Sequence, residues 1–336
     1  MDVLIVDDEN TVRDLMARWL ESGGYSVVTA SSAEEALDRL ETAAPAVALC
    51  DIRMPGHDGL WLADRIRQAH PETAVIMATG LQDVGPAVQS LRQGVIDYLT
   101  KPFGRDRLQE AVTRGLEWHR SAWDARRWRE SLEQEMEIRR VRLNDAIAAL
   151  QVDSDESLDG MLSMVTLTDR DAYAHGYRVA ALAVSIARTL GMPDEALAAV
   201  EHGALLHDLG KLAVPEAILR KPAPLTVEEI LLVRRHPAIG SDLIAQVPYL
   251  AAAVPIVRHA YERMDGQGYP DGIRAAQVCV GARIVGVADA YDAMTRPRVF
   301  RDAITPGSAL LELERCSGTQ FDALIVDALK NMVTSL

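Results

Sequence analysis

The stretch VLIVDDEN, residues 3–10, joins a continuous apolar run to a pair of acidic residues. Four more short apolar runs follow: YSVVTA at 25–30, AVALC at 46–50, AVIMAT at 74–79 and DYLT at 97–100. Helix-period segments lie between them: TVRDLMARWL at 11–20, AEEALDRLE at 33–41, LWLADRIRQA at 60–69 and VGPAVQSLRQG at 84–94. Continuous runs rich in β-branched residues that alternate with helices predict a doubly wound α/β fold, with a parallel sheet covered on both faces.

Polar residues stand at the ends of these predicted strands, where function collects in such folds. Asp7 and Asp8 follow the first strand, Asp51 the third, Thr79 the fourth and Lys101 the fifth. Three neighbouring carboxylates would repel one another unless a cation lay between them, and oxygen-rich surroundings suit Mg²⁺. The hydroxyl and the ammonium would suit a tetrahedral anion. Solvated loop acids are the alternative, but they explain five groups at corresponding positions poorly.

The segments LIVDDEN, CDIRMPGHDGL, ATG and YLTKPF resemble the receiver domain of bacterial two-component response regulators in both order and spacing. The resemblance covers residues 1–120 and implies that a sensor histidine kinase phosphorylates Asp51. Tyr98 stands at the position of a switch aromatic, and a cis peptide bond is expected between Lys101 and Pro102. A receiver-like domain that is never phosphorylated is the alternative.

The same resemblance implies a Mg²⁺ site and a phosphoryl-binding pocket. The implied residues are Asp8, Asp51 and the backbone carbonyl of Arg53 for Mg²⁺, Asp7 through water, and Thr79 and Lys101 for the phosphoryl oxygens.

Residues 104–150 have mixed charge and lack a strand pattern. Apolar residues recur there at a spacing of seven with others between: Met136, Leu143 and Leu150, with Leu132 and Ala146. This pattern predicts a long helix that can pair with a copy of itself to form a homodimer. Arg129 and Arg139 weaken the seam, so a solvated connector helix is the alternative. We therefore expect a receiver at 1–120, a helical linker at 121–158 and an all-α region at 159–336.

The strongest signal in the second half is GALLHDLGKLAVP, residues 203–215. His207 and Asp208 are adjacent there, and Lys211 follows one turn later. A lone His-Asp pair could be a hydrogen-bonded pair at a helix end. Separate helical segments, however, also present His175, His236 and Asp289 in apolar surroundings. Since burying such groups unpaired is costly, a shared Fe, Mn or other transition metal is the economical explanation.

This order of ligands, with Gly268, Tyr269 and Pro270 before the last one, resembles the HD-GYP subgroup of the HD phosphohydrolase superfamily. ILRKPAPL at 218–225 and GTQFD at 318–322 belong to the same resemblance, which runs from residue 161 to the end. It implies an all-helical domain that uses two or three metals and hydrolyses cyclic di-GMP.

The resemblance carries over to individual residues. One metal would be held by His175, His207, Asp208 and Asp289, a second by His236 with Asp208, and a third would need Asp171, which stands in place of a glutamate. Asp208 and Lys211 would be catalytic, and the substrate would contact Lys211, Tyr269, Arg298 and Arg301.

One departure puts catalysis in question. The family pattern places two histidines where this chain has Ala260 and Tyr261, and His259 comes one position early, about 100° away around a helix. The second metal site is therefore degenerate. The domain is either a weak cyclic di-GMP phosphodiesterase, or an inactive module that binds the nucleotide or contacts a protein through its Gly-Tyr-Pro loop.

The composition limits the kinds of partner and location that we expect for this chain. A net charge of -14 leaves no basic surplus for DNA phosphates. No apolar run approaches the ~20 residues that span a bilayer, and no secretory signal precedes the first strand. The three cysteines, Cys50, Cys279 and Cys316, share no close spacing. We expect a soluble, cytoplasmic protein without disulfides.

Overall fold

The computed structural model describes residues 2–80, 95–149, 158, 160–164, 170–297 and 302–334. The chain divides into two compact units, Met1–Trp128 and Arg129–Leu336, and each is described by itself. The helix expected at 84–94 lies outside the described residues.

The first unit is built on a five-stranded sheet, and the five expected strands are all present. They are β1(Asp2–Val6), β2(Ser26–Ala30), β3(Val47–Asp51), β4(Ala74–Gly80) and β5(Asp97–Lys101), in the order β2-β1-β3-β4-β5. All neighbours are parallel. Asp51 pairs with Ala78, and Thr79 pairs with Thr100. The register therefore brings the polar ends of the central strands to one edge of the sheet.

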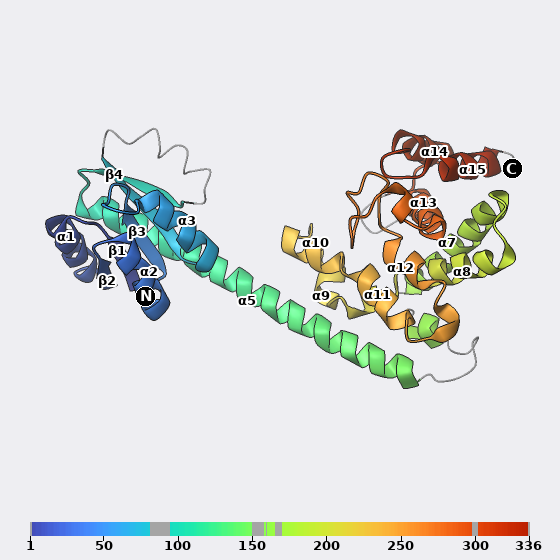
Figure 1. Ribbon diagram of the computed structural model, residues 1–336, viewed down its shortest axis with the longest axis horizontal. Coiled ribbons are helices and arrows are strands. Elements are labelled where there is room, and N and C mark those ends of the chain that lie inside the picture. Colours follow the sequence, from blue (N-terminus) through green and yellow to red (C-terminus); the bar gives the residue numbers. More distant parts are fainter. Residues whose placement is uncertain are drawn as a thin grey trace. The chain divides into compact units, whose positions relative to one another are not determined.

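Helices cover both faces of this sheet (Figure 1). One face packs against α1(Asn10–Glu21) and the start of α5(Arg105–Ala149), and the other against α2(Ala33–Ala43) and α3(Gly59–Ala69). Two of these helices begin at capping side chains: Ser32 accepts a hydrogen bond from Glu35 N, and Asp58 accepts one from Trp61 N. The predicted doubly wound α/β fold is confirmed.

Helix α5 is continuous over 45 residues, as the long-helix prediction required. In the second unit, however, its apolar seam contacts its own chain. Leu132 and Met136 are buried in a cluster with Val214, Ile218 and Leu232, and Leu143 and Ile147 pack against the main core. The seam that predicted a homodimer is therefore largely occupied within the chain, and pairing with a second copy stays a prediction. Leu150 lies outside the described residues.

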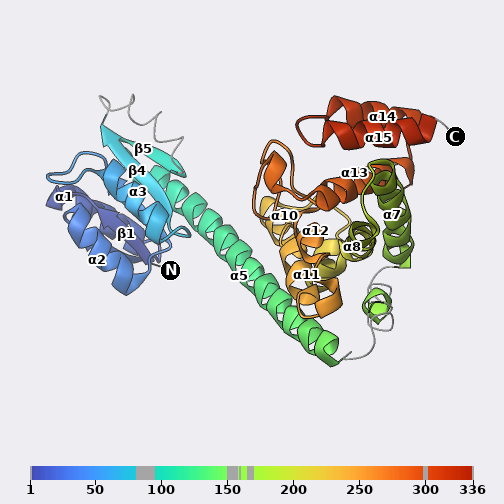
Figure 2. The same ribbon diagram turned by 45° about the vertical axis from the view of Figure 1, so that its right-hand side comes forward.

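The second unit is helical, which confirms the all-α prediction. Its further elements are α7(Arg170–Thr189), α8(Asp194–Leu206), η2(Leu209–Ala213), α9(Glu216–Leu219), α10(Val227–Val233), α11(His236–Ile244), η3(Pro248–Leu250), α12(Val254–His259), η4(Ala275–Gln277), α13(Val280–Thr295), α14(Pro306–Arg315) and α15(Ala323–Thr334). Helices α7, α8 and α13 pack against one another (Figure 2). Buried apolar side chains such as Val179, Val200 and Ile284 fill the space between them. Within the described ranges, no helix is long and apolar enough to cross a membrane.

Candidate metal centres

The receiver pocket lies at the carboxyl edge of the sheet. Asp7, Asp8 and Asp51 each offer a carboxylate oxygen within 4.8 Å of the others. The Lys101 ammonium donates to Asp7 Oδ2 at 2.7 Å and lies 3.0 Å from Asp51 Oδ1. Thr79 is buried beside them, and its hydroxyl donates to the carbonyl of Gly80 at 3.1 Å. The structure thus brings together all five residues that sequence reasoning placed at the strand ends.

Electrostatics in this pocket favour an added cation. Burial raises the pKa of Asp51, as do the charges of Asp7 and Asp8, although Lys101 opposes them. Burial also disfavours charge on Lys101, yet its hydrogen bonds to Asp7 and Asp51 raise its pKa overall. One lysine therefore faces three carboxylates, and a divalent ion would relieve the excess of negative charge.

The backbone around Asp51 is closely packed. A Cβ at Gly59, the first residue of α3, would lie 2.0 Å from the carbonyl oxygen of Asp51, so only glycine fits there. The Lys101–Pro102 peptide is cis, as expected. Arg53 follows β3 on an exposed loop next to the pocket, and Tyr98 is partly buried on β5.

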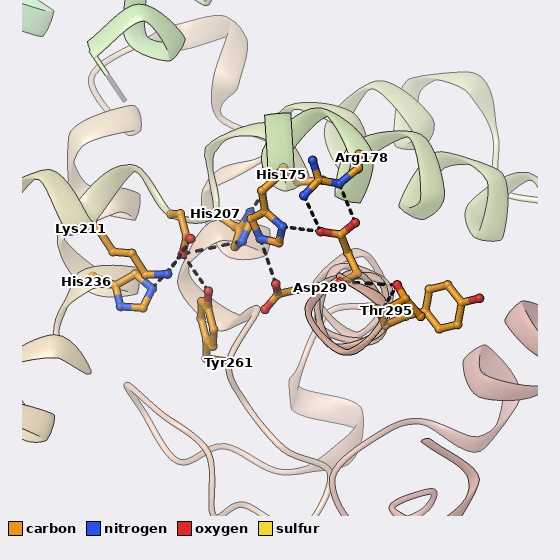
Figure 3. Close-up of polar contacts among 12 residues, drawn as sticks. His175, Arg178, His207, Lys211, His236, Tyr261, Asp289 and Thr295 are labelled. Carbon is orange, nitrogen blue, oxygen red and sulfur yellow. Dashed lines mark hydrogen bonds and ion pairs between the residues drawn. The ribbon is translucent and has the colours of Figure 1, made fainter. Parts of the chain in front are cut away.

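The second cluster joins three helical segments of the other unit (Figure 3). His175 comes from α7, His207 ends α8, and Asp289 comes from α13. His175, His207 and Asp208 can each place one ligand atom within 4.8 Å of the others. His175 Nε2 lies 3.1 Å from Asp289 Oδ1. The four residues expected to hold one metal are therefore neighbours.

Backbone carbonyls fix two of the histidine rings. His207 Nδ1 donates to the carbonyl of Ala204 at 2.6 Å, and His236 Nδ1 donates to that of Val233 at 2.8 Å. Because a carbonyl only accepts, each Nδ1 carries a proton, and in the neutral ring each Nε2 presents a lone pair. Both Nε2 atoms are buried and make no hydrogen bond within the described part of the chain. Buried lone pairs of this kind fit a metal ion.

Asp208 is the meeting point of the cluster. Lys211 Nζ donates to its Oδ2 at 2.6 Å, and the Tyr261 hydroxyl donates to its Oδ1 at 2.7 Å. His207 Nε2 and His236 Nε2 lie 3.7 and 3.4 Å from the same Oδ1. Although burial favours the neutral acid, nearby positive charge, that of Lys211 first, holds the pKa of Asp208 well below its usual range. Asp208 is therefore a carboxylate ready to bind a cation.

Residues 260 and 261, where two histidines were expected, supply no imidazole to the cluster. Ala260 offers no ligand atom, and Tyr261 occupies Asp208 Oδ1, the oxygen nearest His236. Burial, followed by the charge of Asp208, raises the pKa of Tyr261 well above its usual range, so its hydroxyl keeps its proton. His259 turns to the Gly-Tyr-Pro loop, where its Nε2 lies 3.1 Å from Asp271. It therefore lies beside the cluster, and whether it is a ligand stays a prediction.

Comparison with known proteins accords with both clusters. A model of the response regulator receiver domain matches residues 3–113, and a model of the HD domain matches residues 161–325. The chain is 32% identical over 335 residues to the cyclic di-GMP phosphodiesterase response regulator RpfG of Xanthomonas campestris, covering 98% of this chain and 87% of that protein. The chain belongs to the receiver–HD response regulators.

Two further relatives have related names. A cyclic di-GMP phosphodiesterase of Thermotoga maritima is 28% identical over 330 residues, which cover 98% of this chain and 89% of the relative. The cyclic di-GMP phosphodiesterase PA4108 of Pseudomonas aeruginosa is 37% identical over 173 residues, which cover 51% of this chain and 42% of the relative. Both family models imply divalent metal binding, and in each region ligand-type side chains lie close enough together to hold an ion.

A pocket of about 460 Å³ opens beside the HD cluster of this receiver–HD regulator. Asp289, Tyr261, Tyr269 and Arg234 belong to its lining. The rings of Tyr261 and Tyr269 stack with centroids 5.3 Å apart, and the Arg234 guanidinium lies over Tyr269. The lining therefore combines aromatic rings with both basic and acidic side chains, and it includes Asp289, an expected metal ligand.

Three residues expected at this site are not among those described. They are Arg298, Arg301 and the side chain of Asp171.

Sequence reasoning missed the residues behind His175. Asp292 accepts from His175 Nδ1 at 2.7 Å, and Arg178 binds both oxygens of Asp292. Asp292 is three residues after Asp289, and Arg178 is three residues after His175. The i,i+3 spacing, which places each pair on one helix face, was the available signal.

Proposed function

We propose that the chain is a response regulator in which phosphorylation of Asp51 controls the hydrolysis of cyclic di-GMP by the HD region. The observation that supports it most strongly is the convergence of two buried histidine nitrogens, Nε2 of His207 and of His236, on the carboxylate of Asp208. The choice of cyclic di-GMP as the substrate rests on the names of the two relatives that span nearly the whole chain.

In the receiver region, a sensor histidine kinase would supply the phosphoryl group. Asp8, Asp51 and the carbonyl of Arg53 would hold Mg²⁺, with Asp7 assisting through water. Lys101 Nζ, which lies 3.0 Å from Asp51, would neutralise a phosphoryl oxygen, and Thr79 would donate to another. Phosphorylation adds charge at this edge of the sheet, and the neighbouring loops would respond to it.

In the HD region, His175, His207, Asp208 and Asp289 would hold a transition metal, Fe or Mn. When bound, such an ion polarises a phosphate and lowers the pKa of water. Lys211 Nζ lies beside Asp208 and would stabilise charge on the phosphate oxygens. The nucleotide would occupy the adjoining pocket, in contact with Tyr269.

Two further contacts with the nucleotide remain predictions, those of Arg298 and Arg301. A third metal at Asp171 also remains a prediction.

A single ion limits the rate. Tyr261 neutralises no charge, whereas a second ion would, and each ~1.4 kcal/mol of lost transition-state stabilisation costs about tenfold in rate. We infer a slow phosphodiesterase. A homodimer formed through the linker, and a protein partner at the Gly-Tyr-Pro loop, belong to the same proposal.

The test measures cyclic di-GMP turnover with Mn²⁺ or Fe²⁺, together with metal content. The wild type should bind about one ion per chain and hydrolyse cyclic di-GMP slowly, and Asp208→Ala should lose both properties. The double variant Ala260→His with Tyr261→His should gain a second ion and turn over faster.

Other outcomes would decide against the proposal. A wild type that binds the ion and the nucleotide without hydrolysing it would be a binding module. Metal content that is unaffected by Asp208→Ala would remove the proposed centre.

A further inference from the structure

Behind the proposed ion site lies a second layer of charged side chains. Asp292 is 7% exposed, accepts from His175 Nδ1 at 2.7 Å and receives both ends of the Arg178 fork, at 2.7 and 3.0 Å (Figure 3). None of these contacts involves the atoms that would hold the ion. His175 is thereby enclosed between two carboxylates, that of Asp292 at Nδ1 and that of Asp289 at Nε2.

The two nitrogens of His175 have different tasks. A metal ligand must present a lone pair, so the nitrogen that binds the ion cannot carry a proton. Asp292 is a carboxylate and can only accept, which keeps the proton on Nδ1. In the ion-free protein, burial disfavours charge on His175, but its hydrogen bonds to Asp289 and Asp292 raise its pKa to about 9. A bound ion would replace the proton on Nε2, the atom that faces Asp289 at 3.1 Å, and take its lone pair. His207 reaches the same tautomer differently, through the carbonyl of Ala204.

Arg178 adds a second constraint. Its bidentate contact fixes the plane of the Asp292 carboxylate, and Asp292 in turn fixes the plane of the His175 ring. His175 and Arg178 are three residues apart on α7, and Asp289 and Asp292 are three apart on α13. The two helices therefore each contribute one residue to the ion and one residue to the layer behind it.

We propose that Asp292, held by Arg178, is a positioning residue that sets the tautomer and orientation of His175 for metal binding. This inference rests on the proposed metal centre and deepens it. A carboxylate hydrogen-bonded to a ligating imidazole raises its basicity, and loss of such a partner typically weakens metal affinity about 10- to 100-fold.

The decisive variant is Asp292→Asn. Arg178 Nε binds Oδ1 of Asp292, while its other nitrogen shares Oδ2 with His175 Nδ1. With the amide oxygen at the Oδ1 position, the NH₂ faces His175 Nδ1, and the ring must then carry its proton on Nε2. We expect Mn²⁺ affinity, measured by chelator competition without nucleotide, to fall about 10- to 100-fold. Long-range ¹H–¹⁵N spectra of the histidine-labelled, ion-free protein above pH 9, where His175 is neutral, should report the change of tautomer at this ring, which a merely structural role would not produce.

A matched control exists on α10. Glu229 is also a buried carboxylate held by a cation, with Lys221 Nζ at 2.7 and 2.9 Å, but it lies outside the ion site. Glu229→Gln should lower thermal stability and leave Mn²⁺ affinity and the His175 tautomer unchanged. Equal loss of affinity in Asp292→Asn and Glu229→Gln would overturn the proposal, as would an unchanged tautomer and affinity in Asp292→Asn.

A second variant, Arg178→Gln, tests the same contact. If Asp292→Asn does not fold, Arg178→Gln leaves the carboxylate in place and should weaken Mn²⁺ binding with the proton still on Nδ1. Unaltered affinity in that variant would contradict the proposal. Because ion binding and tautomer are read without nucleotide, a lack of cyclic di-GMP turnover would count against the proposed function and leave this inference standing.

Discussion

Gly210 lies in η2, just after Asp208, where this segment packs closely against the start of α11 at His236. A Cβ at this position would lie 1.9 Å from the carbonyl oxygen of His236 and 2.7 Å from the amide nitrogen of Gly240. Since backbone atoms cannot move aside cheaply, Gly210→Ala must push η2 away from α11. We expect a loss of about 1–3 kcal/mol in unfolding free energy, together with weaker Mn²⁺ binding. Thermal unfolding and chelator competition measure the two effects.

The control for this variant is Gly307→Ala. A Cβ there meets nothing within 4 Å, and the residue lies in the first turn of α14, so alanine should be neutral or slightly stabilising. If Gly210→Ala behaved like Gly307→Ala in both measurements, the close approach of η2 and α11 would be incorrect.

For single residues, motif spacing predicted which side chains meet at Asp208, because each functional side chain lies at a fixed offset within its own segment. Two features escaped it. The hydrogen bond from Tyr261 depends on the rotamer of a side chain that replaces a histidine. The i,i+3 spacing places Asp292 on the same helix face as Asp289, but its contact with His175 also depends on how α13 packs against α7.

Among the elements, α5 has the most informative packing. Met136 is 3% exposed and lies against Val214, three residues beyond Lys211. Met136→Ala would leave a cavity, and we expect it to cost about 2 kcal/mol in the unfolding free energy of the second unit. Ile138, on the same helix but 53% exposed, supplies the matched control, since Ile138→Ala should change that free energy by less than about 0.5 kcal/mol. Equal effects in urea denaturation would mean that α5 does not pack in this way.

Helix α5 also shows what apolar spacing can and cannot predict about the packing of a helix. A spacing of seven correctly identified its apolar face, on which Leu132, Met136 and Leu143 lie. Spacing alone cannot distinguish a seam that meets a second copy from one that meets another part of the same chain, because both bury the same stripe. The strands were easier to predict, since a parallel sheet needs continuous apolar runs whatever its neighbours are.

For the whole molecule, α5 is the covalent route by which a signal at Asp51 can reach the HD region. Near its start Leu108 and Val112 pack beneath the sheet, and further along Leu132 and Met136 pack against the segment that follows Lys211. Beryllofluoride with Mg²⁺, which mimics the phosphoryl group, should therefore change the rate of cyclic di-GMP turnover. If phosphorylation frees the apolar seam, sedimentation should also show a shift from monomer to dimer.

Asp51→Asn removes the acceptor and should abolish both responses, while leaving Mn²⁺ binding in the HD region intact. Met136→Ala keeps the acceptor but loosens the contact with Val214, so it should bind beryllofluoride normally and yet respond with a smaller change in turnover. A full response in Met136→Ala would mean that the signal does not pass through this packing. Unchanged turnover and mass in the beryllofluoride-treated wild type would show that the receiver does not control the HD region at all.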